Sequence, residues 1–263
     1  MFTTVCFDLD GTLLNSKKEI EPESKDAIRR LKENGVCIIF ASARHFCEIA
    51  PYITECNLSE SDYVISCDGQ YIVDTAGNVI WENNFLRRKD IVWLNDRIKS
   101  EFTVCTDYGD YKFYNETFKK CIKRHIRKSG DSCNGKKKVS RFDIWFQKNT
   151  RKIEKVIINK KIRDITATER FTVRVFDTER TEVFQKGVTK YQAISELHKK
   201  GFIKSLDELL YFGDDYNDTE CFLNIRHCVA MGTAPGSIKE KACFVTTSCD
   251  ENGIAYALEK LAL

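Results

Sequence analysis

Near the N-terminus stands the run Thr3-Thr4-Val5-Cys6-Phe7-Asp8-Leu9-Asp10-Gly11-Thr12-Leu13-Leu14, in which aspartates directly follow an apolar segment. The β-branched and aromatic residues predict a buried strand over residues 3–8. Residues two apart on a strand point to the same side, so Asp8 and Asp10 are expected to face one ligand. Gly11 allows the backbone to turn sharply beside it. Such a pair of carboxylates suits metal binding, acid–base chemistry or covalent catalysis by a carboxylate.

Short strands alternate with amphipathic helices on both sides of the chain's centre, which predicts a parallel sheet covered on both faces. The N-terminal part predicts a helix over 22–34, strands over 36–41 and 63–67, and hairpins at Asp68-Gly69 and Gly77-Asn78 flanking strands 71–73 and 79–81. The last third predicts helices over 188–200, 216–225, 236–241 and 252–261 and strands over 209–213, 227–231 and 243–247. The expected fold class is therefore α/β, with ligands at the carboxyl ends of the parallel strands.

The middle of the chain has a different order of elements. It predicts helix, strand, strand and helix, followed by a strand over 142–146, a helix over 150–164 and a strand over 172–176. This order is typical of an α+β insert that is large enough for its own small sheet. We therefore expect a core domain formed by residues 1–82 and 184–263, and a second domain formed by residues 83–183.

The composition favours a folded, cytoplasmic protein without a nucleic-acid, membrane or protein partner. Among 263 residues, 42 Lys and Arg stand against 39 Asp and Glu, and 42% of the residues are hydrophobic. No apolar run approaches the roughly 18 residues of a membrane span, and the N-terminus lacks the basic and apolar regions of a signal peptide. The 12 cysteines show no C-x-x-C spacing and are expected to be reduced structural residues.

Four motifs, in order, resemble those of the haloacid dehalogenase (HAD) superfamily. The first is the D-x-D-G-T run at Asp8, and the second is Ser42 at the end of the next core strand. The third is a lysine in the stretch Thr181-Glu-Val-Phe-Gln-Lys186-Gly-Val-Thr-Lys190, and the fourth is Gly213-Asp214-Asp215-Tyr-Asn217-Asp218. The insert lies between the second and third motifs. This arrangement resembles the Cof-like phosphatases with a type 2B cap, and it implies a Rossmann-like HAD core with the cap over residues 83–183.

The resemblance implies a Mg²⁺-dependent phosphatase that acts on small phosphorylated metabolites, such as sugar phosphates, through an aspartyl-phosphate. It assigns attack on phosphorus to Asp8 and acid–base chemistry to Asp10, with Lys186 as the catalytic lysine. The expected phosphate-binding residues are Ser42, Lys186 and Asn217, and the expected metal ligands are Asp8, Asp10 (through its main-chain carbonyl), Asp214 and Asp218. Mg²⁺ prefers hard oxygen ligands of this kind.

Other features of the sequence leave alternatives open. A phosphomutase of the phosphomannomutase type shares this cap, and a catalytically idle phosphate-binding protein is the alternative from another class. Arg44 follows Ser42 closely enough to contact the substrate. The tripeptide Asp68-Gly69-Gln70 stands where the Cof-like branch usually has Asn-Gly-Ala. The segment 119–141 holds ten Lys and Arg against one acidic residue, which we interpret as a solvated basic face of the cap.

Overall fold

The computed structural model describes residues 2–98, 102–107, 109–113, 122–125, 138–139, 151–160, 162, 169–176 and 179–263. The chain forms two units, one made of Met1–Asn83 with Thr189–Leu263 and the other of Asn84–Val188. The boundary after Val188, where the chain returns to the first unit, lies a few residues later than the sequence pattern suggests. The reason is that the strand Thr181–Gln185 pairs inside the second unit.

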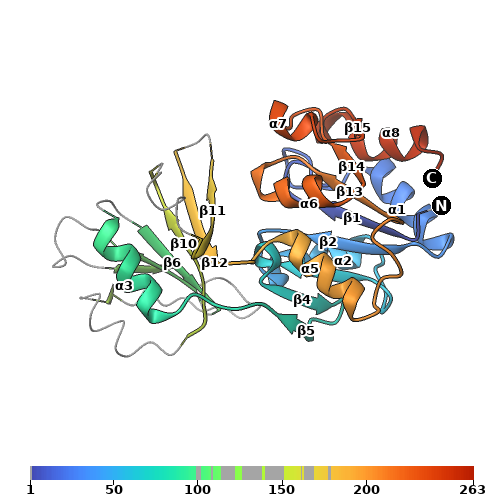
Figure 1. Ribbon diagram of the computed structural model, residues 1–263. Helices are drawn as coiled ribbons and strands as arrows, with labels where there is room; N and C mark the ends of the chain where they lie inside the picture. The colour runs from blue at the N-terminus through green and yellow to red at the C-terminus, as the bar shows by residue number, and fades with distance from the viewer. Residues whose placement is uncertain are drawn as a thin grey trace. The chain divides into compact units, whose positions relative to one another are not determined.

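The first unit contains an eight-stranded sheet in the order β15-β14-β13-β1-β2-β3-β4-β5 (Figure 1). The strands from β15 to β3 are parallel, and β4 and β5 are antiparallel hairpin strands. The fold class is therefore the α/β class expected from the sequence. The strands are β1 (Thr4–Asp8), β2 (Cys37–Ala41), β3 (Tyr63–Ser66), β4 (Tyr71–Asp74), β5 (Val79–Glu82), β13 (Leu209–Gly213), β14 (His227–Ala230) and β15 (Phe244–Val245).

Helices cover both faces of this sheet, because the side chains of each parallel strand alternate between two apolar cores. Val5 and Phe7 of β1 pack with α1, α2 and α8, whereas Cys6 packs with α5, α6 and α7. The helices are α1 (Pro22–Glu33), α2 (Phe46–Glu55), α5 (Lys190–Lys199), α6 (Thr219–Asn224), α7 (Gly236–Lys239) and α8 (Gly253–Lys260). Three single turns of 3₁₀ helix are η1 (Cys67–Gly69), η2 (Tyr216–Asp218) and η3 (Cys249–Glu251).

The second unit contains an antiparallel sheet, whose described strands run in the order β11-β12-β10-β6-β7-β8-β9. The apolar side of helix α3 (Arg88–Arg97) packs on it through Ile91 and Leu94, which share a core with Val104, Val156 and Val183. The strands are β6 (Phe102–Thr106), β7 (Gly109–Phe113), β8 (Ile122–His125), β9 (Lys138–Val139), β10 (Ile153–Ile158), β11 (Phe171–Val175) and β12 (Thr181–Gln185).

Some elements of the structure differ from the sequence predictions, and strand β12 is one that was not expected. The helix expected over 150–164 is wrong, because Ile153–Ile158 forms strand β10 between β6 and β12. Helix α2 was not expected; it contains Pro51, a residue that usually ends a helix. The strand expected over 142–146 lies outside the described residues, as does most of the basic segment 119–141.

Two further observations concern the described residues of both units. Within the described ranges, no helix has the length and apolar character that a bilayer crossing requires. Most of the ten cysteines in these ranges are buried, which fits the expectation of structural residues.

Candidate active site

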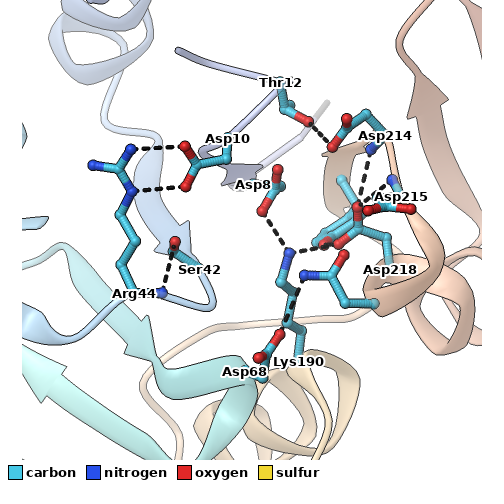
Figure 2. A network of polar contacts seen from close by, with 12 residues as sticks. Asp8, Asp10, Thr12, Ser42, Arg44, Asp68, Lys190, Asp214, Asp215 and Asp218 are labelled. Atoms are coloured by element: carbon cyan, nitrogen blue, oxygen red, sulfur yellow. Dashed lines mark hydrogen bonds and ion pairs between the residues drawn. The ribbon is translucent and has the colours of Figure 1, made fainter. Parts of the chain in front are cut away.

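The candidate site lies at the carboxyl ends of three neighbouring parallel strands, β2, β1 and β13 (Figure 2). Asp8 is the last residue of β1, Ser42 follows β2, and Asp214 follows β13. Because parallel strands end at the same edge of a sheet, segments far apart in sequence meet there. Asp8 and Ser42 are only 4% and 1% exposed, so this edge is largely closed to solvent around them.

The loop after β1 makes close contact with the loop after β13. Gly11 has a φ of +85°, in the left-handed region that favours glycine, and a Cβ there would lie 2.2 Å from Asp214 Oδ2. Thr12 Oγ1 donates a hydrogen bond to Asp214 Oδ1 at 3.2 Å. Glycine at position 11 is therefore needed both for the turn and for the approach of Asp214.

The lysine at the site is Lys190, and the expectation that Lys186 fills this role is wrong. Lys190 Nζ lies 2.5 Å from Asp8 Oδ1 and 2.6 Å from Asp218 Oδ1, and it is fully buried. Lys186 lies exposed in the turn after β12. Helix α5 begins at Lys190, because Thr189 is its N-cap and accepts a hydrogen bond from the Gln192 amide. The pair Thr189-Lys190 is the sequence signal that could have identified this helix start and its lysine.

Asp218 holds Lys190 and closes the loop after β13. Its Oδ1 accepts hydrogen bonds from Lys190 and from the Tyr211 hydroxyl at 2.6 Å, and its Oδ2 accepts from the main-chain amides of Asp214 and Asp215. A Cβ on Gly213 would lie 2.6 Å from Asp218 Oδ2, so this strand end also requires a small residue. With both oxygens accepting hydrogen bonds, Asp218 is better suited to positioning Lys190 than to binding a metal.

The charge balance of the site fits a divalent cation. Oxygens of Asp8, Asp214 and Asp218 all lie within 4.8 Å of one another. Burial raises the pKa of Asp214 to about 9, and the neighbouring charges of Asp8 and Asp218 add to the effect. Burial also raises the pKa of Asp8 to about 7, although Lys190 opposes this rise. One ammonium thus does not neutralise these carboxylates, and their oxygens are the ligands that Mg²⁺ prefers.

Asp10 is paired with two cations in this structure. Arg44 Nε and Nη2 donate to the two carboxylate oxygens, each at 2.7 Å, and Lys18 Nζ donates to Oδ1 at 2.7 Å. Burial favours a higher pKa for Asp10, but the hydrogen bonds from Arg44 and Lys18 outweigh it and lower the pKa. Tyr52 completes this arrangement: its hydroxyl accepts from Arg44 Nη1 at 3.3 Å and donates to the Lys18 carbonyl.

The sequence singled out Asp10 and Arg44 separately, but it gave no signal for their pairing or for Lys18. Arg44 was expected to contact a substrate, and here its guanidinium contacts Asp10 while its main-chain amide donates to Ser42 Oγ at 3.2 Å. Asn217 lies in η2, and its Nδ2 donates to Asp68 Oδ1 at 3.2 Å. Of the expected site residues, all except Lys186 therefore belong to the first unit's strand-end cluster or to its contacts.

Several known proteins are similar to this chain in sequence and fold. The family profile of the haloacid dehalogenase-like hydrolases matches residues 5–258. A putative phosphatase of Bacillus subtilis, YxeH, is 27% identical over 278 residues, covering 100% of this chain and 99% of the relative. The 5-amino-6-(5-phospho-D-ribitylamino)uracil phosphatase YcsE of the same organism is 24% identical, covering 98% of this chain and 95% of the relative.

The fold has a counterpart among solved structures. A sugar phosphatase of HAD subclass IIB superposes with a TM-score of 0.75 at 19% identity, covering 99% of each chain. The match of the family profile over almost the whole sequence, together with the aspartates at the strand ends and the buried lysine at the start of α5, establishes that this chain belongs to the haloacid dehalogenase-like hydrolases and is an enzyme of their phosphatase branch.

Proposed function

We propose that this phosphatase hydrolyses small phosphorylated metabolites with Mg²⁺, through an aspartyl-phosphate on Asp8. The observation that carries the proposal is the contact between two buried side chains, Asp8 and Lys190, at the end of a central parallel strand. A carboxylate can approach a phosphate dianion only if positive charge offsets their repulsion. Lys190 supplies one such charge at the nucleophile itself.

Asp8 is the proposed nucleophile. Lys190 holds Asp8 Oδ1 and so fixes the orientation of the carboxylate at the strand end. An Asp8 oxygen forms a bond to phosphorus as the bond between phosphorus and the substrate's alcohol oxygen breaks. Water then attacks the phosphorus of the aspartyl-phosphate, which releases inorganic phosphate and regenerates the Asp8 carboxylate.

Asp10 is the proposed acid and base. It gives a proton to the departing alcohol oxygen in the first step and accepts one from the attacking water in the second. In the present arrangement Arg44 and Lys18 keep Asp10 ionised, since their hydrogen bonds lower its pKa. Acid catalysis therefore requires these two side chains to loosen their hold on Asp10 when substrate is bound.

The metal is assigned to Asp8, Asp214 and the main-chain carbonyl of Asp10. When bound, Mg²⁺ supplies positive charge that offsets the repulsion between the carboxylates and the phosphate. Asp214 would be ionised in that state, because the positive charge of the cation offsets the burial and the neighbouring carboxylates that raise its pKa. Ser42, Asn217 and Lys190 are the proposed donors to the phosphoryl oxygens.

The proposed substrate class rests on the insert and on the relatives. The second unit, Asn84–Val188, is proposed to be the cap that sets specificity, with the first unit as the catalytic core. Of the proteins described above, one is named a sugar phosphatase and another a 5-amino-6-(5-phospho-D-ribitylamino)uracil phosphatase. Both names point to small phosphate esters as substrates. A cytoplasmic location, where such esters are metabolised, is part of the proposal.

The experiment is an assay of phosphate release from a panel of phosphorylated metabolites with Mg²⁺. We expect release by the wild type and its loss in Asp8→Asn and after chelation of Mg²⁺. Release that persists in Asp8→Asn would contradict the nucleophile assignment. Interconversion of sugar phosphates without release of phosphate would identify a phosphomutase instead.

A further inference from the structure

A single turn between β3 and β4 lies against the proposed phosphate donors. In this turn, η1, Asp68 is 1% exposed and has a φ of 60°, a conformation in which aspartate, asparagine and glycine are the common residues. Its main-chain amide donates to the carbonyl of Ser42 at 2.9 Å. A Cβ on the next residue, Gly69, would lie 2.1 Å from the carbonyl oxygen of Thr189. The turn is therefore packed between the Ser42 loop and the start of α5.

The carboxylate of Asp68 affects the other two proposed phosphate donors, Asn217 through a hydrogen bond and Lys190 through its charge. Asn217 Nδ2 donates to Asp68 Oδ1 at 3.2 Å. Burial lowers the pKa of Lys190, but Asp218, Asp8 and Asp68 together raise it well above its ordinary value. Asp68 is thus a further buried acid next to the lysine, and the proposed reaction gives it no part in bond making or breaking.

The hydrogen-bond chemistry of a carboxylate fixes the orientation of the Asn217 amide. An ionised carboxylate only accepts hydrogen bonds, so Asn217 must turn its NH₂ group, and not its carbonyl, toward Asp68. The second N–H of this group then has a defined direction. A neutral amide at position 68 would permit both orientations, because it can donate as well as accept.

The charge of Asp68 has a separate effect. A buried negative charge close to the phosphate donors repels a bound phosphate dianion, and this repulsion is screened little by solvent. Phosphate is also the product of the proposed reaction, so the same repulsion favours its departure.

We propose that Asp68 is a positioning residue of the phosphate pocket, which orients the Asn217 amide and weakens the binding of inorganic phosphate through its charge. This inference rests on the proposed function for the location of the pocket. It concerns a residue of the chain that differs from the asparagine usual in the Cof-like branch.

The test measures the affinity of the full-length protein for inorganic phosphate by calorimetry in the presence of Mg²⁺, which requires no turnover. Asp68→Asn keeps the shape and an acceptor but removes the charge. Asp68→Gly removes the acceptor as well as the charge, and it introduces no backbone strain, since glycine adopts a φ near +60° freely. Each variant is also combined with Asn217→Ala, and thermal melting verifies that every variant is folded.

We expect Asp68→Asn to bind phosphate about threefold to tenfold more tightly than the wild type, because a buried like charge is gone. Asn217→Ala should weaken binding about tenfold in the wild type, about threefold to fivefold in Asp68→Asn, where the amide permits both orientations of Asn217, and about twofold or less in Asp68→Gly, where Asn217 has lost its orienting acceptor. A merely structural role for Asp68 does not produce this dependence.

Two results would overturn the inference: unchanged or weaker phosphate binding by Asp68→Asn, or an equal effect of Asn217→Ala in all three backgrounds. These results are distinct from a failure of the proposed function. If the wild type hydrolyses no phosphate ester but the affinities follow the expected pattern, the role of Asp68 stands and the phosphatase mechanism falls. If the wild type is an active phosphatase but the pattern is absent, only the role of Asp68 falls.

Discussion

Lys190 Nζ and Asp8 Oδ1 lie 2.5 Å apart, although 182 positions separate the two residues in the sequence. The contact joins the end of the sheet's central strand β1 to the first residue of helix α5. Both side chains are buried, so their attraction is screened little by solvent. The lysine balances part of the negative charge of the acidic cluster, and its contact with Asp8 supports the proposal that Asp8 is the nucleophile.

This contact predicts different results for two lysines only four residues apart. Lys190→Ala removes the ammonium next to Asp8, and we expect kcat to fall about a hundredfold to a thousandfold, as for other preorganised groups that stabilise developing charge. Lys186→Ala is the matched control, because it removes the same charge from an exposed turn, and it should change kcat less than about twofold. The measurement is steady-state phosphate release at saturating Mg²⁺. Equal losses in both variants would restore Lys186 as the catalytic lysine.

Gly11 provides a test of the close contact between the loops after β1 and β13. An alanine there meets Asp214 Oδ2, whereas Gly35 has a similar φ of +75° with nothing within 4 Å of an added Cβ. Both substitutions should lower the free energy of unfolding by about 1–2 kcal/mol through backbone strain. Only Gly11→Ala should also raise the Mg²⁺ concentration required for half-maximal activity, because it displaces Asp214. If Gly35→Ala shifts the Mg²⁺ requirement equally, the effect comes from stability alone.

The raised pKa values of Asp8 and Asp214 predict how the stability of the metal-free protein depends on pH. Their carboxyls take up protons at about pH 7 and about pH 9 in the folded state, but near their ordinary value of 3.8 when unfolded. Between pH 4 and 9 the folded state therefore binds more protons, and the free energy of unfolding falls as the pH rises. Mg²⁺ should reverse this loss, since it favours the ionised carboxylates of the folded protein.

Thermal unfolding at pH 5 to 9, with a chelator or with Mg²⁺, measures this dependence. Asp214→Asn is the control, because it removes the carboxyl with the higher of the two values, and it should flatten the decline in the chelated protein. A metal-free protein whose melting temperature does not fall over this range, or whose decline is the same in Asp214→Asn, would contradict the assignment of these carboxylates.

The parallel core could be predicted closely from the sequence because its strands are short, apolar and separated by amphipathic helices. The strand expected over 209–213 is β13, Leu209–Gly213. Asp8 and Asp10 were singled out from their place at a strand end, whereas Asp214 was assigned through the resemblance to the HAD motifs. The local pattern is sufficient for the central strands of this unit, because they are apolar on both faces, but it did not predict helix α2.

The second unit was predicted less well because local pattern and tertiary pairing disagree there. In Ile153–Ile158, apolar residues at positions 153, 156 and 157 have helical spacing, yet the segment pairs on both sides with antiparallel strands. The choice between Lys186 and Lys190 had a similar cause. Both lysines lie near the expected helix start, and only the packing of Thr189 and the turn at Gly187, with a φ of +85°, decides which one enters the site.

The arrangement of Asp10 predicts a dependence on the leaving group of the substrate. If Asp10 protonates the departing oxygen, Asp10→Asn should lower kcat for an alkyl phosphate about a hundredfold or more. An aryl phosphate such as p-nitrophenyl phosphate leaves as a stable anion and needs little protonation, so its first step should be much less affected. Because the second step also uses Asp10 as a base, the burst of p-nitrophenol in rapid mixing, and not the steady-state rate, is the measurement that isolates the first step. An Asp10→Asn variant whose burst with p-nitrophenyl phosphate is slowed as strongly as its turnover of the alkyl ester would show that Asp10 acts on the nucleophile or the metal instead.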